Sequence, residues 1–97
     1  MSAYMLADVA WHNEEAHREY VAKFGGTLTK YGGHVLAGDP APKILEGPWK
    51  VHTLVIIEFP DMTSLNAWYT SPEYQPLIAL RKSCTSDQDM MFTLEGV

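Results

Sequence analysis

Apolar and polar positions along the chain predict four β-strands. Residues 4–11 alternate with the period of two that is typical of a strand, and residues 34–37 and 89–95 are shorter strand candidates. Residues 51–59 form the clearest strand, and both of its faces are largely apolar. We therefore expect this strand to be central in its sheet and covered on both sides.

The pattern also predicts a long helix after the first strand. Apolar residues recur every three or four positions between residues 16 and 31, which indicates about five helical turns. Asn13 is a suitable N-cap, and the glycine pair at 32–33 suits the C-terminal end. A second glycine pair at 25–26 lowers helix stability, so we expect close packing or a local break there.

Two shorter helices are predicted after the central strand. Asp61 or Thr63 caps the first of these helices. Pro76 disfavours a regular helical turn in the residues that precede it, so the second helix begins near Gln75. The resulting order is β-α-β-β-α-β. Short connections and right-handed crossovers then favour an α+β fold with one antiparallel four-stranded sheet and helices on one face.

One layer of helices leaves the second face of such a sheet open. Because both faces of residues 51–59 are apolar, that open face is expected to be an interface. We therefore predict a homodimer in which two sheets pack face to face. An obligate interface of this kind buries more than about 2,000 Å² in total.

Composition excludes several classes of protein. The 97 residues suffice for a single domain, residues 1–97, and 46% hydrophobic with 20% charged residues excludes intrinsic disorder. A net charge of −5 argues against nucleic acid as a partner. No apolar run approaches the ~20 residues of a membrane span, and no signal peptide is visible. The single cysteine, Cys84, fits the reducing cytoplasm.

Neither a metal ion nor another cofactor is expected. His12 and His17 are five residues apart, which is not the spacing of four that aligns two ligands on one helix face. Both histidines are expected to face solvent. Glycine-rich phosphate-binding motifs are absent as well.

Several short segments resemble the DUF1330 family, whose members are small proteins of the dimeric α+β barrel superfamily. In chain order they are Tyr31-Gly32-Gly33, Leu45-Glu46-Gly47, Val55-Ile56-Ile57-Glu58-Phe59-Pro60, Trp68-Tyr69-x-Ser71-Pro72-Glu73-Tyr74 and Glu95-Gly96-Val97. The resemblance implies a ferredoxin-like βαββαβ monomer that pairs into a dimeric α+β barrel. Family members often carry an arginine where this chain has Thr53, so any role of that arginine is absent or passes to His52 or Lys50.

Glu58 is the first candidate for chemistry, because it is the only acid within the strongest apolar strand. A buried carboxylate needs a partner, and Arg81 on the apolar side of the last helix is a suitable one. The pair is either a structural link between helix and sheet or part of a catalytic site, and the third possibility is that Glu58 is solvated at the end of its strand. His52, at the start of the same strand, is an alternative base.

An aromatic set is the second candidate feature. Tyr20, Trp68 and Tyr74 are expected either to fill the core or to contact a planar organic ligand between sheet and helices. We favour a cofactor-independent enzyme, isomerase-like or monooxygenase-like, that acts on a small organic molecule in this pocket. The alternative is a non-catalytic small-ligand-binding or stress-associated accessory protein, and a haem enzyme is the least favoured because no histidine lies on a helix stripe.

Overall fold

A computed structural model describes residues 1–86 and 89–97 of the chain. Its helices and strands are, in order, β1 (Ala3–Val9), α1 (Glu14–Thr29), β2 (His34–Asp39), β3 (Thr53–Phe59), α2 (Met62–Tyr69), α3 (Gln75–Ser83) and β4 (Met90–Glu95). The β-α-β-β-α-β order is as predicted, with the second helical region divided into α2 and α3.

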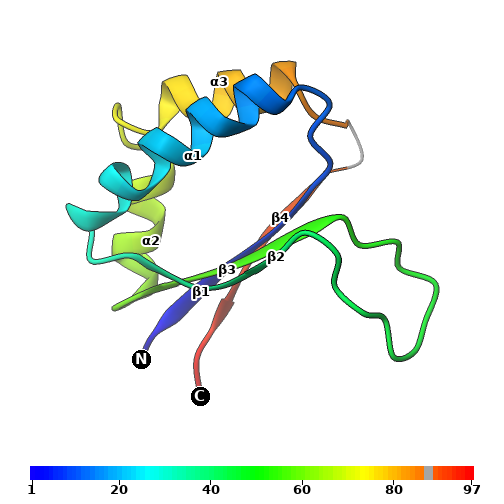
Figure 1. Cartoon of the computed structure of the whole chain (residues 1–97). Coiled ribbons are helices and arrows are strands. Elements are labelled where there is room, and N and C mark those ends of the chain that lie inside the picture. The colour runs from blue at the N-terminus through cyan, green and yellow to red at the C-terminus, as the bar shows by residue number, and fades with distance from the viewer. Residues whose placement is uncertain (87–88) are drawn as a thin grey trace.

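The four strands form one antiparallel sheet in the order β2-β3-β1-β4. Figure 1 shows all three helices on one side of this sheet and none on the other. This arrangement confirms the predicted ferredoxin-like α+β fold. We call the side without helices the open face, and the register places Leu6, Ile56 and Phe92 on it in one row across the sheet.

Local signals define both ends of α1. The Asn13 side chain accepts a hydrogen bond from the Ala16 backbone N–H at 3.0 Å, as an N-cap does. At the other end Gly32 has a φ of 74°, its N–H donates to the Thr29 carbonyl at 3.2 Å, and the Gly33 N–H donates to the Leu28 carbonyl at 3.0 Å. These bonds form a Schellman motif, which requires the left-handed conformation that glycine adopts without strain.

The expectation for the central glycine pair is wrong. Helix α1 continues unbroken through Gly25 and Gly26, and both are exposed. A Cβ atom built at either position meets no other atom within 4 Å, so the chain itself does not pack closely there.

An aromatic cluster joins the helices to the sheet. The rings of Trp68 and Tyr74 stack with their centroids 4.1 Å apart, and both side chains are fully buried. Phe24 from α1 and Phe59 from β3 pack against Trp68, at 5.9 Å and 5.4 Å between centroids. The Trp68 indole N–H donates to the Thr27 hydroxyl at 3.0 Å. Trp68 therefore fixes α1 and α2 onto one end of the sheet.

Gly26→Ala is expected to stabilise the protein by about 1 kcal/mol, because alanine loses less backbone entropy in an exposed helix interior. Urea unfolding measures the free energy of unfolding. Gly33→Ala is the matched control, because its Cβ would lie 2.6 Å from a Phe59 ring atom and overpacking costs about 1–3 kcal/mol. Equal effects of the two substitutions would contradict this account.

Candidate functional site

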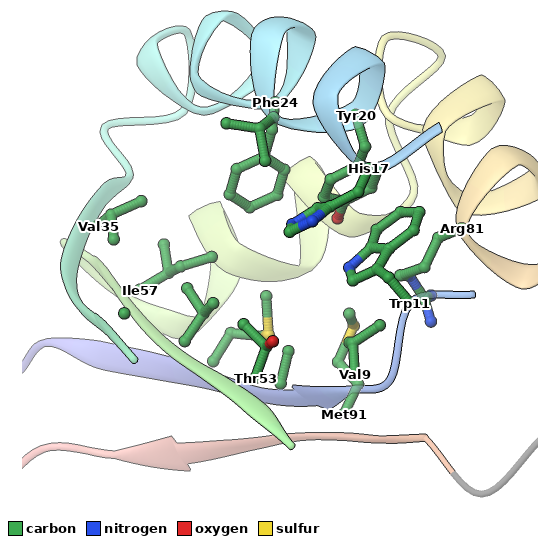
Figure 2. Close-up of a pocket in the computed structure, with 15 residues that line it drawn as sticks. Val9, Trp11, His17, Tyr20, Phe24, Val35, Thr53, Ile57, Arg81 and Met91 are labelled. Carbon is green, nitrogen blue, oxygen red and sulfur yellow. The ribbon is translucent and has the colours of Figure 1, made fainter. Parts of the chain in front are cut away.

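A cavity of about 210 Å³ lies between α1 and the helix-covered face of the sheet. We call it the apolar cavity, because most of its lining is aliphatic or aromatic (Figure 2). The lining residues are Met5, Ala7, Val9, Trp11, His17, Tyr20, Val21, Phe24, Val35, Gly38, Thr53, Val55, Ile57, Arg81 and Met91.

Strand alternation selects the floor of the apolar cavity. Met5, Ala7 and Val9 are odd-numbered residues of β1 and point toward the helices, and β3 contributes Val55 and Ile57 by the same rule. The methyl group of Ala7 fills little volume beneath α1, so it leaves space between the sheet and the helix. A void with such apolar walls favours an apolar ligand over water.

Arg81 is the charged residue of the lining. It lies in the last turn of α3, and only 5% of it is exposed. Its Nε atom is buried and has no hydrogen-bond partner, and within the described residues no carboxylate forms an ion pair with its guanidinium. Arg81 also lines a second cavity of about 290 Å³, which we call the polar cavity. The other residues of the polar cavity are Lys82, Thr85, Ser86 and Asp89.

Two buried tyrosines lie beside Arg81. The hydroxyl groups of Tyr20 and Tyr74 share a hydrogen bond of 2.7 Å. Burial is the main reason that the pKa of each phenol is raised above its ordinary value, and the charge and hydrogen bonding of Arg81 oppose the rise. Both phenols are therefore neutral at physiological pH and act as hydrogen-bond donors and acceptors.

His17 and Trp11 complete the same end of the cavity. Their rings stack with centroids 4.8 Å apart and an interplanar angle of 16°. Figure 2 shows both rings beside Tyr20, near Arg81. The expectation that His17 faces solvent is wrong, since it is half-buried and lines the apolar cavity. A signal was present in the sequence, because His17 lies three residues before Tyr20 on the same helix face.

The predicted Glu58–Arg81 pair does not form. Glu58 lies opposite Tyr4 in the β1–β3 register and points to the open face, whereas Arg81 is on the helix-covered face. The carboxylate of Glu58 instead contacts the His34 Nε2 atom at 3.1 Å and forms a hydrogen bond with the Tyr4 hydroxyl. That bond and the Glu58 charge raise the pKa of Tyr4. Glu58 therefore lies outside the apolar cavity.

His52 lies outside the apolar cavity as well. Its backbone N–H donates to the Asp8 carboxylate at 2.7 Å, and its Nδ1 atom is 3.7 Å from the same oxygen. The Trp49 indole N–H donates to the other oxygen of Asp8 at 3.1 Å. Asp8 points to the open face, so this cluster fastens the end of the β2–β3 loop to that face. The predicted role of His52 as a base in the sheet–helix pocket does not fit this position.

The three predicted ligand-binding aromatics have different positions. Tyr20 lines the apolar cavity, whereas Trp68 and Tyr74 are fully buried behind it. Tyr74 still acts on the site through its hydrogen bond to Tyr20. Trp68 belongs to the core that supports the site.

No group of three His, Cys, Asp or Glu side chains within residues 1–86 and 89–97 is arranged to hold a metal ion. Among the helices of these residues, none is long and apolar enough to cross a bilayer.

A family comparison gives the chain its place among known proteins. The family described as "Domain of unknown function (DUF1330)" matches residues 2–97. The chain belongs to the DUF1330 family. A comparison with curated proteins found no match for it.

Solved structures similar to this DUF1330 protein share its fold at low sequence identity. A protein of unknown function from Rhodopseudomonas palustris is 18% identical, with 99% of this chain and 82% of that chain covered and a TM-score of 0.78. A dimeric ferredoxin-like protein of unknown function from Jannaschia sp. CCS1 is 19% identical, with coverage of 99% and 100% and a TM-score of 0.76. A putative antibiotic biosynthesis monooxygenase from Nitrosomonas europaea is 6% identical, with coverage of 99% and 90% and a TM-score of 0.68.

The buried tyrosines predict a loss of stability at alkaline pH. The pKa values of both phenols are higher in the folded state than in the unfolded state. Their contribution to the free energy of unfolding is therefore complete below the unfolded pKa of 10.0 and is lost as the pH rises toward the folded-state pKa values. We expect the unfolding free energy of this DUF1330 protein to fall above pH 10 by up to about 1.4 kcal/mol per pH unit for each phenol that stays protonated in the folded state. Urea unfolding between pH 8 and 11 measures the slope, and a Tyr20→Phe/Tyr74→Phe variant with an equally steep slope would contradict the assignment.

Proposed function

We propose that the protein is a cofactor-independent enzyme that transfers a proton on a small organic molecule bound in the apolar cavity. The observation that carries this proposal is the grouping of His17, Tyr20 and Arg81 at one end of a mostly apolar space (Figure 2). An apolar pocket with a few convergent polar groups is the usual form of a small-molecule site. Its volume lies below the ~300–1,000 Å³ of pockets for drug-sized ligands, so the molecule is small.

His17 is the proposed base. Imidazole accepts and returns protons near neutral pH, and of the four histidines, all of them in the described residues, only His17 lines the apolar cavity. Tyr20 is the proposed hydrogen-bond donor. When Tyr74 donates in the shared hydrogen bond, the Tyr20 proton is left to be donated to an oxygen of the ligand.

The reaction that these groups suit begins at a carbon next to a carbonyl group. His17 removes a proton from that carbon, and the electron pair of the C–H bond moves to the carbonyl oxygen as an enolate. Tyr20 stabilises the negative oxygen by its hydrogen bond. Return of the proton from His17 to another carbon of the conjugated system completes an isomerisation without any other reactant.

The same proton removal would also begin an oxygenation, which is the second reaction type expected from the sequence. The Nitrosomonas europaea protein is described as a putative antibiotic biosynthesis monooxygenase, and it shares the fold with this chain. That similarity supports oxygenation only through the fold, and one fold hosts many activities.

One observation favours a non-catalytic ligand-binding or accessory protein as the second candidate. The ring of His17 is held by its stack on Trp11, and within the described residues no carboxylate forms an ion pair with it. A histidine base is usually oriented by a third polar group. A protein that only binds its ligand needs the apolar cavity and not this group.

We also propose that two copies pair through their open faces. Leu6, Ile56 and Phe92 form a half-buried apolar row on the open face, and Leu94 is 46% exposed. Such a continuous apolar surface is typical of an interface. The Jannaschia protein, described as dimeric, has the same fold. We also propose that the protein is located in the cytoplasm. The free thiol of Cys84 supports this, because cysteines stay reduced there.

His17→Gln tests the enzyme. Exchange of the α-protons of phenylpyruvate, acetophenone and 2-cyclohexenone for deuterium in D₂O, followed by ¹H NMR, is expected to be accelerated by the wild-type protein for at least one probe. General-base catalysis contributes about 10²–10⁴-fold, so His17→Gln should slow that exchange by at least about 100-fold.

His12→Gln is the matched control, because His12 is exposed five residues before His17 and does not line the apolar cavity. It should leave the exchange rate unchanged. Binding of the probes without any exchange would favour the non-catalytic candidate, and an unchanged rate in His17→Gln would exclude His17 as the base.

Ile56→Lys tests the homodimer. Light scattering should give about 22 kDa for the wild type, twice the chain mass of 10.9 kDa, and about 11 kDa for the variant, because the buried charge is not compensated. Ala22→Lys adds the same charge on the exposed surface of α1 and should remain dimeric. A wild-type mass of 10.9 kDa at micromolar concentration would overturn the proposal.

A further inference from the structure

We propose that the ligand of the apolar cavity is a small organic acid, and that its carboxylate pairs with the guanidinium group of Arg81. The inference rests on the proposed function and deepens it, because it names the chemical class of the molecule on which the site acts. It also assigns Arg81 as a binding residue, separate from the proton transfer at His17 and Tyr20.

Arg81 is a buried cation whose charge is not neutralised by the described chain. Only 5% of the residue is exposed, and its Nε donor has no acceptor. Burial of an unpaired charge is unfavourable, so a buried guanidinium normally has a carboxylate or phosphate partner. The guanidinium hydrogen-bonds to Tyr20 and Tyr74, but both are neutral phenols, and they cannot cancel a positive charge.

Asp89 is the competing partner within the chain. It lines the polar cavity together with Arg81, and its Oδ2 atom is buried without a hydrogen-bond partner. Its Oδ1 atom accepts the backbone N–H of Ala10 at 3.1 Å, which holds the carboxylate at the end of β1. The two side chains nevertheless form no ion pair, so the Nε donor of Arg81 remains without an acceptor.

The position of Arg81 suits an amphipathic anion. Figure 2 shows its side chain at the end of the apolar cavity that Trp11 and His17 also border. The planar guanidinium forms two parallel hydrogen bonds with a carboxylate, and the aliphatic and aromatic walls receive the rest of the molecule. The volume of about 210 Å³ then indicates one ring or a short chain attached to the acid group.

Matched pairs of acids and amides test this assignment. Dissociation constants for benzoate and benzamide, and for cinnamate and cinnamamide, are measured by calorimetry with the purified full-length protein. Each pair has nearly the same shape and differs in charge. We expect each acid to bind the wild type about 10–100-fold more tightly than its amide, as charge-assisted hydrogen bonds imply.

Three variants locate the effect. Arg81→Met should bind each acid and its amide equally and should not lower the melting temperature, because an unpaired buried charge has been replaced by an apolar side chain. Arg81→Lys keeps the charge without the planar fork and should retain a smaller preference for the acids. Lys82→Met removes an exposed charge from the same helical turn and should keep the wild-type preference.

Equal binding of acids and amides by the wild type would overturn the assignment and leave the proposed function standing. So would a preference for acids that persists in Arg81→Met, or the absence of binding by all four probes at about 10 mM. A lower melting temperature in Arg81→Met, together with equal binding by the wild type, would show that the arginine is only structural. Acid binding through Arg81 with unchanged proton exchange in His17→Gln would instead overturn the proposed base and support this inference.

Discussion

The alternation of side chains along β1 and β3 determines which residues of this protein can share a site. Successive residues of a strand point to opposite faces, and helices cover only one face of this sheet (Figure 1). Val55 and Ile57 therefore line the apolar cavity, whereas Ile56 and Glu58 point to the open face. A register shift of one residue would exchange these two sets. The same constraint separates the cavity from the open face, so one strand serves both the proposed ligand site and the proposed dimer.

Unequal packing beneath the helices creates the apolar cavity. At one end of the sheet, Trp68 and Phe59 fill the space under α1 and α2 with large rings. Further along β1, the small side chain of Ala7 fills little of the space beneath α1, and Tyr20 and Trp11 line the same cavity. Protein interiors are normally packed without such gaps, because a void forfeits dispersion contacts. A cavity retained beside the aromatic cluster is therefore consistent with a preformed space for the proposed ligand.

Features that depend on local chemistry could be predicted from the sequence, and features that depend on the choice of face could not. Asn13 and Asp61 cap their helices as expected, because a capping side chain needs only the backbone three residues ahead. The Glu58–Arg81 pair was a wrong prediction, since two apolar faces on residues 51–59 do not indicate which face receives the helices. His17 was missed because it was interpreted through its spacing from His12 and not through its spacing from Tyr20.

Arg81 lines both cavities, so its charge borders the apolar cavity and the polar cavity. Its place in the last turn of α3 lets the helix dipole stabilise it, by about 0.3–2 kcal/mol. Removal of a cation from water costs several kcal/mol, so the dipole alone does not compensate. The polar cavity, about 290 Å³ and lined by hydroxyl and carboxylate groups, is large enough for water to hydrate one side of the guanidinium. On the side of the apolar cavity, the hydroxyl groups of Tyr20 and Tyr74 hydrogen-bond to Arg81, but both phenols are neutral. An anion that enters the apolar cavity therefore meets a cation that has no counter-charge on that side.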